Sequence, residues 1–383
     1  MTQQDATFLK MALAEAWKSA GHTRPNPPVG AVVVRNGEVI GRGRHRRCGG
    51  DHAEVAAIKD ALRHLTSIRP LKALTPLRPL VPLMALRPLA GATVYVTLEP
   101  CSRPGRVGAC TDALIAAGVA RVVWAEPDPN PVNRGRAARV LAKAGIVGER
   151  FRGRIDLAED WPCGRDAAAL IAPFAKHVAT GRPYVTVKLA MSLDGRICDD
   201  RGCASWISSP AARRRTGRLR EIVDAVMVGA ETVRRDNPSL LCHTRRNDDL
   251  WRVVISRSGR LPRRAQIFTD AAKDRTLVFP DPRTALEELG RRGFLHVLCE
   301  GGLNLARSLA EAGLVDEVRS LLPYRSCPAL QTVGYREIFS YLDGDISLDR
   351  AVELVQQHSR NYAKRQLTWW RRDPSITWLP ATR

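Results

Sequence analysis

Hydrophobic residues follow helical spacing at the start of the chain and then alternate with polar residues as strands do. The stretch FLKMALAEAWKSAG puts apolar residues on one helical face and ends at Gly21, a common helix stop. AVVVRNGEVIGRG then reads as two runs around Asn36-Gly37, a strong signal for a tight hairpin turn. We therefore expect a helix followed by a pair of strands.

Helices and strands continue in turn as far as residue 150. An alanine-rich helix begins at DHAEVAAI, TVYVTLEP is a strand, and the next helix ends at Gly118. RVVWAE is a further strand and RGRAARVLAKAG a further helix. This alternation predicts a mostly parallel sheet covered by helices, with ligands bound at the ends of its strands.

A second α/β region begins after a helical, linker-like stretch between Asp156 and Pro183. Its strand YVTVKLAMSLDGRI is followed by a helix that starts at Ser209 and Pro210. DAVMVGAETVRRDNPSL, WRVVIS, RTLVFP and LHVLCEGGLNLARSLAEAG add further strands and helices. No strand is followed by G-x-G-x-x-G, so a Rossmann cofactor site is not supported.

The segment from Ser67 to Gly91 departs from this pattern. Arg-Pro-Leu occurs in it three times. Frequent prolines remove hydrogen-bond donors and block helix formation, so we expect an inserted surface loop. A Pro-rich recognition tract is the functional alternative, and a long loop adds little closure entropy to the flanking fold.

The composition excludes some classes of protein but does not identify the function. A net charge of +21 would attract phosphates, but the arginines are spread along the whole chain, which argues against a nucleic-acid surface. The nine cysteines form no disulfide framework and indicate reduced thiols. Because no apolar span reaches membrane length and MTQQDATFLK lacks a signal-peptide pattern, we expect a cytoplasmic protein.

Two thiols and one imidazole form the strongest chemical constellation. His52, Cys101 and Cys110 lie at predicted strand or helix junctions, and they could supply the three protein ligands of a catalytic zinc site. Cys110 opens a helix, whose N-terminus favours the thiolate. Glu54 would be the proton carrier. Alternatively, Asp51 and Glu54 form only a capping box, and each cysteine is a small buried hydrophobe.

Four ordered motifs resemble a known family. PNPPVG from Pro25 to Gly30, HAE, the long loop between the two cysteines and DPNP from Asp128 to Pro131 resemble the pyrimidine deaminase half of the bifunctional riboflavin-biosynthesis deaminase/reductases. KLAMSLDGR, ASWISSPAAR, RRDNPSL and CEGGLNLA resemble the reductase half. The resemblance implies a cytidine-deaminase-like three-layer α/β domain followed by a dihydrofolate-reductase-like domain that uses NADPH.

The resemblance also implies site residues in the deaminase half. Asn26, His45 and Asn130 would line the pyrimidine and ribose site. Arg106 matches a basic residue of the family, and Arg103 stands where the family has a histidine, so both are expected to contact the substrate phosphate. The sequence VGAC replaces the family's T-P-P-C ending, which changes the loop around the substrate.

In the reductase half the resemblance implies two sets of residues. Those near the substrate are Lys188, Arg220, Leu240 and Glu300. Those near the cofactor are Ala190, Trp206, Thr232, Asp236, Gly301 and Gly302. Ala204 replaces a family serine, and LLCH replaces L-T-x-R, so Arg245 or Arg246 would have to hold the substrate phosphate.

The C-terminal segment resembles a different family. ALQTVGY, YAKRQLTW and the ending DP-x-I-x-W are similar to the end of the tRNA dimethylallyltransferases, and the junction is expected between Gly313 and Val318. Ser347 could cap a helix with one apolar face formed by Leu348, Val352, Val355, Ser359, Tyr362 and Leu367. Four basic residues lie elsewhere on it: Arg360, Lys364, Arg365 and Arg371. With Trp369 and Trp370 they would suit RNA, whereas the alternative is a solvated basic face.

The chain is thus expected to contain a zinc-dependent deaminase domain at 1–150 with the insert at 67–91, a linker at 151–182, a shortened reductase domain at 183–318 and a tail at 319–383.

The expected reactions are hydrolytic deamination of a phosphoribosylated diaminopyrimidinone and NADPH-dependent reduction of its ribosyl group. A deaminase with an inactive second domain and a tRNA-editing deaminase remain alternatives. No P-loop is present for prenyl transfer. A homo-oligomer is compatible with the sequence.

Overall fold

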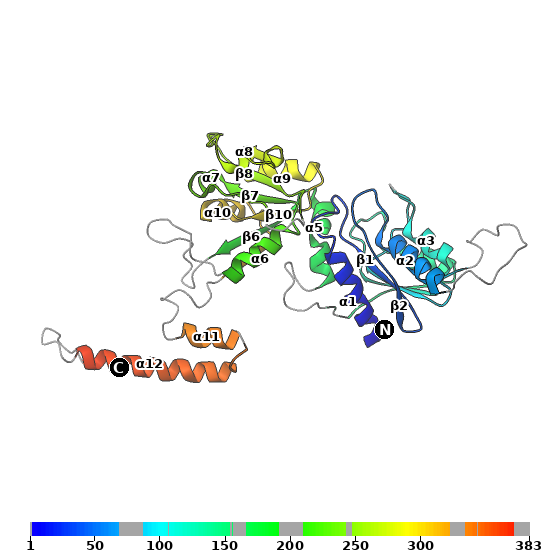
Figure 1. Ribbon diagram of the computed structural model, residues 1–383, viewed down its shortest axis with the longest axis horizontal. Helices are drawn as coiled ribbons and strands as arrows, with labels where there is room; N and C mark the ends of the chain where they lie inside the picture. Colours follow the sequence, from blue (N-terminus) through cyan, green and yellow to red (C-terminus); the bar gives the residue numbers. More distant parts are fainter. Residues whose placement is uncertain are drawn as a thin grey trace, which may run out of the picture. The chain divides into compact units, whose positions relative to one another are not determined.

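The computed structural model describes residues 2–68, 87–105, 107–153, 155, 166–190, 210–242, 247–321, 334–342 and 344–370. Two compact units are present (Figure 1). The first comprises residues 1–188 and 214–319 and holds both sheets, whereas the second comprises residues 189–213 and 320–383. Most of the insert, at 69–86, lies outside the described residues.

The first sheet has five strands in the order β2-β1-β3-β4-β5. The strands are β1 (Gly30–Arg35), β2 (Glu38–Arg44), β3 (Thr93–Leu98), β4 (Arg121–Glu126) and β5 (Val147–Arg150). β1 is antiparallel to β2 and β3, whereas β3, β4 and β5 are parallel. Four of the five strands therefore run in one direction, so the prediction of a mostly parallel sheet holds except for β1, which the predicted hairpin at Asn36-Gly37 reverses.

Helices cover both faces of this sheet. One core packs α2 (Ala53–Ile68), α3 (Cys110–Ala117) and α4 (Ala137–Lys143) against the sheet, and it includes Ala57, Leu114 and Leu141. The opposite core packs α1 (Gln3–Trp17) and the start of α5 (Ala167–Thr180), including Leu9 and Leu170. The expected three-layer domain is confirmed.

The second sheet has six strands in the order β11-β6-β10-β7-β8-β9. The strands are β6 (Tyr184–Ala190), β7 (Ala225–Gly229), β8 (Trp251–Ile255), β9 (Thr276–Phe279), β10 (His296–Cys299) and β11 (Glu317–Leu321). β6, β10, β7, β8 and β9 run parallel. The helices are α6 (Pro210–Arg220), α7 (Ala230–Asp236), α8 (Gln266–Thr269), α9 (Pro282–Arg291) and α10 (Leu303–Glu311). The carboxyl ends of the parallel strands therefore meet at one edge of the sheet.

The tail contains α11 (Tyr335–Leu342) and α12 (Leu348–Trp370). Ser347 caps α12, since its hydroxyl accepts the Arg350 N–H at 3.2 Å. His358 pairs with Glu337 of α11 at 2.5 Å. Because Leu348 and Val352 are 54% and 48% exposed, the expected apolar face is not buried at its start. The side chains of Tyr362, Arg365, Leu367, Trp369 and Trp370, and all of Arg371, lie outside the described residues.

No helix in the described segments is both long and apolar enough to span a lipid bilayer.

Candidate active sites

His52, Cys101 and Cys110 converge at one end of the first sheet. His52 immediately precedes α2, Cys101 follows β3, and Cys110 is the first residue of α3. The Nδ1 atom of His52 lies 3.1 Å from Sγ of Cys110 and 3.6 Å from Sγ of Cys101. All three potential ligand atoms lie within 4.8 Å of one another.

This donor set fits zinc. Zn–S bonds of about 2.3 Å and Zn–N bonds of about 2.0 Å in a tetrahedral site place neighbouring ligand atoms roughly 3.5 to 3.8 Å apart. The observed separations are of that order. Two sulfurs with one imidazole suit Zn²⁺ better than hard cations, which prefer oxygen ligands.

The start of α3 favours the ionised form of one thiol. The Cys110 N–H donates to Sγ of Cys101 at 3.3 Å. Hydrogen bonding by Cys110 and by His52 lowers the pKa of the Cys101 thiol. The thiolate is the form that binds metal, so the local backbone prepares this ligand.

Glu54 lies in the first turn of α2 beside the cluster. Its side chain is 3% exposed, and burial raises the pKa of its carboxyl to about 7. The capping-box alternative is disfavoured, because the helix begins at Ala53 and the carboxylate of Asp51 pairs with Lys59 at 2.7 Å. Glu54 shares a cavity with His52 and Cys101, so its carboxyl lies beside the potential metal ligands.

The cavity has a volume of about 380 Å³, within the range of small-molecule sites, roughly 300 to 1,000 Å³. The predicted deaminase residues among its lining are Asn26, His45, His52, Glu54, Cys101, Arg103 and Asn130. Cys110 is fully buried behind them. Arg106 lies outside the described residues.

Hydrogen bonds within the protein determine which side-chain atoms of Asn26 and Asn130 remain available to a ligand. Nδ1 of His45 lies 3.0 Å from the Asp51 carbonyl, which only accepts, so Nδ1 carries the proton and Nε2 accepts from the Asn26 amide at 3.1 Å. Asn26 therefore retains its oxygen as an acceptor. Asn130 is the converse case, since its oxygen accepts the Val132 N–H at 3.1 Å and its amide N–H groups remain as donors.

Glu99 was not among the predicted residues, yet it organises the loop that bears Asn130. Its buried carboxylate accepts the N–H groups of Asp128 at 3.2 Å, Gly135 at 3.0 Å and Ala137 at 3.2 Å. Glu99 lies two residues before Cys101, so it ties the metal loop to the Asn130 loop. Phe174 of α5 was also missed, and it lines the same cavity. The contribution of both depends on tertiary placement rather than on a local motif.

Three charged residues of the second sheet meet at its carboxyl edge. Arg220, the last residue of α6, pairs with Glu300 after β10 through two bonds of 2.6 and 3.0 Å. Lys188 near the end of β6 is half-buried, and desolvation lowers the pKa of its amine, opposed by the charge of Glu300. The predicted substrate trio is therefore brought together. Leu240 differs, because it is only 4% exposed and packs in the apolar core of the second sheet.

The predicted cofactor residues lie along the same edge. Thr232 and Asp236 belong to α7, Ala190 ends β6, and Gly302 is the N-cap of α10. Gly301 is tightly enclosed, because a Cβ there would lie 2.6 Å from the Leu305 side chain and 3.3 Å from the Gly229 amide nitrogen. A backbone without a side chain at the start of α10 suits a phosphate-bearing cofactor. Ala204, Trp206, Arg245 and Arg246 lie outside the described residues.

Comparison with known proteins finds three family matches along the chain. Residues 2–126 match the cytidine and deoxycytidylate deaminase zinc-binding region, residues 183–322 the RibD C-terminal domain, and residues 306–373 the IPP transferase family. The third match overlaps the second and covers the segment for which a transferase-like tail was predicted.

Curated relatives and solved structures match most of the chain. The riboflavin biosynthesis protein RibD of Actinobacillus pleuropneumoniae is 31% identical over 92% of this chain and 91% of its own length. That of Escherichia coli is 35% identical over 82% of this chain and 86% of its own length. Acinetobacter baumannii RibD superposes with a TM-score of 0.65 at 31% identity, covering 86% of this chain and 93% of its own. A deaminase/reductase from Thermotoga maritima gives 0.66 at 30% identity with the same coverages.

Proposed function

Because the chain belongs to the RibD family of riboflavin biosynthesis proteins, we propose that its two sheets carry the two reactions at the residues described above. The first reaction is hydrolytic deamination of 2,5-diamino-6-(phosphoribosylamino)pyrimidin-4-one. The second is NADPH-dependent reduction of the ribosyl group to ribityl. The observation that carries the proposal is the convergence of His52, Cys101 and Cys110 beside buried Glu54 in a ligand-sized cavity.

His52, Cys101 and Cys110 would hold the zinc ion. Zinc in such a site supplies the Lewis acidity that makes water nucleophilic at neutral pH. Glu54 takes one proton from the attacking water and delivers it to the ring nitrogen; it then takes the remaining hydroxyl proton of the adduct and delivers it to the amino group, which leaves as ammonia. Its buried position keeps this proton transfer away from bulk water.

The remaining lining residues would orient the substrate. The Asn26 oxygen accepts from an N–H of the pyrimidine, and the Asn130 amide donates to a carbonyl or hydroxyl oxygen. Arg103, with Arg106, provides positive charge for the substrate phosphate. Together these contacts hold the amino-bearing carbon next to Glu54.

In the second site Lys188, Arg220 and Glu300 would bind the deaminated substrate. The Arg220–Glu300 pair presents a fixed carboxylate to ribose hydroxyls, and Lys188 adds a cation beside it. NADPH supplies the hydride for reduction. Thr232 and Asp236 of α7, with Gly301 and Gly302 at the start of α10, would hold this cofactor.

Two measurements test the proposal. Purified wild type and Cys101→Ser are compared for zinc content and for ammonia release from the diaminopyrimidinone. We expect about one zinc per wild-type chain and a large loss of both zinc and turnover in the variant. Equal zinc in both proteins would reject the ligand assignment.

The second site is tested by supplying the deaminated intermediate and following the oxidation of NADPH by absorbance.

We also propose that the chain acts in the cytoplasm on small molecules. Support comes from the need to keep the Cys101 and Cys110 thiols reduced as metal ligands. If the tail instead recruits RNA, tRNA should compete with the substrate, with an affinity that falls steeply as salt is raised.

A further inference from the structure

The loop between α1 and β1 has two faces with different neighbours. Pro25, Asn26 and Pro27 line the deaminase cavity. Thr23, Arg24 and Pro28 line a second, smaller cavity between the two sheets. The loop is therefore shared between the deaminase site and the contact with the second sheet.

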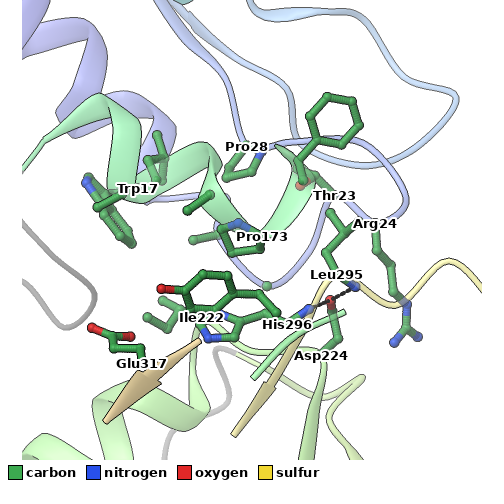
Figure 2. Close-up of a pocket in the computed structure, with 17 residues that line it drawn as sticks. Trp17, Thr23, Arg24, Pro28, Pro173, Ile222, Asp224, Leu295, His296 and Glu317 are labelled. Atoms are coloured by element: carbon green, nitrogen blue, oxygen red, sulfur yellow. Dashed lines mark hydrogen bonds between the residues drawn. The ribbon is translucent and has the colours of Figure 1, made fainter. Parts of the chain in front are cut away.

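Figure 2 shows this second cavity. The residues labelled on the first-sheet side are Trp17, Thr23, Arg24 and Pro28, and those facing them from the second sheet include Ile222, Asp224, Leu295 and His296. Phe174 of α5 lines both this cavity and the deaminase cavity. Ile222 packs against the core under α1 and also against the core of the second sheet. The two halves are thus joined by apolar packing next to the loop.

Backbone contacts show how closely the loop is held. A Cβ on Gly21 would lie 2.7 Å from the Glu221 carbonyl oxygen, and a Cβ on Gly293 would lie 3.0 Å from the Pro25 side chain. Glycine at each position allows an approach that a larger residue would prevent. The loop is therefore held closely at Gly21 and at Pro25 by segments that precede β7 and β10.

Arg24 is the polar anchor within this contact. Its guanidinium carbon lies 4.4 Å from the ring centroid of Phe294, which is 2% exposed and packs edge-on against Trp251. Asp224 supplies negative charge nearby, and its position is fixed because its carboxylate accepts the Leu295 and His296 N–H groups at 2.7 and 3.0 Å. A rigid aromatic face and a fixed carboxylate thus hold the guanidinium in place.

We propose that the second domain positions the substrate loop of the deaminase site, with Arg24 as the positioning residue that acts through Asn26. This inference rests on the deaminase function proposed above. Asn26 is two residues from Arg24 and is bonded on its other side to His45. With Arg24 anchored, the Asn26 oxygen stays directed at the substrate, and without the anchor the loop samples other positions.

The test compares Arg24→Ala, Arg24→Lys, Phe294→Leu and the double variant Arg24→Ala/Phe294→Leu in the full-length zinc-loaded protein. For deamination of the diaminopyrimidinone, Arg24→Ala should raise KM about five- to tenfold with kcat and zinc content unchanged. Arg24→Lys, which keeps the cation, should show a smaller rise. Phe294→Leu should reproduce the KM effect although it lies in the other domain.

The double variant separates positioning from general packing. If both residues act through one contact, its KM should equal that of Arg24→Ala rather than the product of the single effects. Arg139→Ala, an exposed arginine on α4, is the matched control and should leave KM unchanged. KM values within twofold of wild type for both single variants, or independent effects that multiply, would overturn the inference. Absence of ammonia release by wild type would instead overturn the proposed function itself.

Discussion

The two proposed sites balance charge in opposite ways. In the first site, the carboxylate of Glu54 lies beside the imidazole of His52 and two thiols, and those sulfurs and that ring form a donor set that a cation completes. In the second, Arg220 and Glu300 already neutralise each other through two hydrogen bonds. An uncompensated set of soft donors therefore indicates a metal centre, whereas a compensated ion pair indicates a surface shaped for a polar substrate.

The largest effect is expected for Glu54→Gln, which removes the proton carrier and keeps the shape. Deamination should fall by about 10²- to 10⁴-fold, since that is the typical contribution of general acid–base catalysis. Zinc content and NADPH-dependent reduction by the same preparation serve as controls and should be unchanged. Full ammonia release by the variant would leave Glu54 without a catalytic part.

The second site should respond to Glu300→Gln. The change leaves the partly buried Arg220 without its carboxylate partner, so reduction followed by NADPH absorbance should slow by about 10- to 100-fold. Deamination should not change. The matched control is Glu287→Gln, since that glutamate is 53% exposed and its loss should alter neither rate. An equal loss of both activities would contradict the separation of the two sites.

Stability in acid should depend on His296 in the second sheet. Burial lowers the pKa of its ring to about 3, so below about pH 6.5 the unfolded chain binds a proton that the folded chain does not. Its contribution is therefore complete above pH 6.5 and is lost as the pH falls, by up to about 1.4 kcal/mol per pH unit. Urea unfolding at pH 7.5, 6 and 5 should show a shallower pH dependence for His296→Gln. Parallel pH profiles for the two proteins would contradict this assignment.

The smallest effect is expected for Glu99→Gln. The amide would keep one acceptor oxygen but turn its N–H₂ group toward one of the three backbone donors, loosening the loop that bears Asn130. KM for deamination should rise about fivefold, which corresponds to about 1 kcal/mol, the typical net contribution of one hydrogen bond. Zinc content should stay constant. Asp281→Asn, which alters a helix cap in the other domain, is the control.

The chemistry of the first site could be predicted because it depends on residue types that are informative in themselves. Histidine and cysteine at element junctions indicated the metal cluster, and Asn36-Gly37 indicated the hairpin. Glu99 could not be predicted in the same way, since a glutamate gains its importance only from the three N–H groups that the fold brings to it.

Sequence patterns were less informative about long-range arrangement. Alternating helices and strands indicated a mostly parallel sheet, but they did not indicate that β1 pairs with the distant β3 and runs opposite to its neighbours on both sides. Leu240 is buried and has a left-handed backbone conformation, and Arg220 pairs with Glu300. Both features depend on tertiary contacts that no short stretch of sequence encodes. The contact between Arg24 and Phe294 joins residues too distant in the chain for any local pattern.

The packing of helix α5 determines where the chain can be cut into separate fragments. Ala167 and Leu170 fill the core under α1, while Lys176 forms an ion pair with Asp316 beside the second sheet. A cut at residue 150 would remove Ala167 and Leu170 from the amino-terminal half. The apolar side chains of the core under α1 would then be exposed to solvent. A dissection that keeps residues through Gly181 with the amino-terminal fragment would spare that layer.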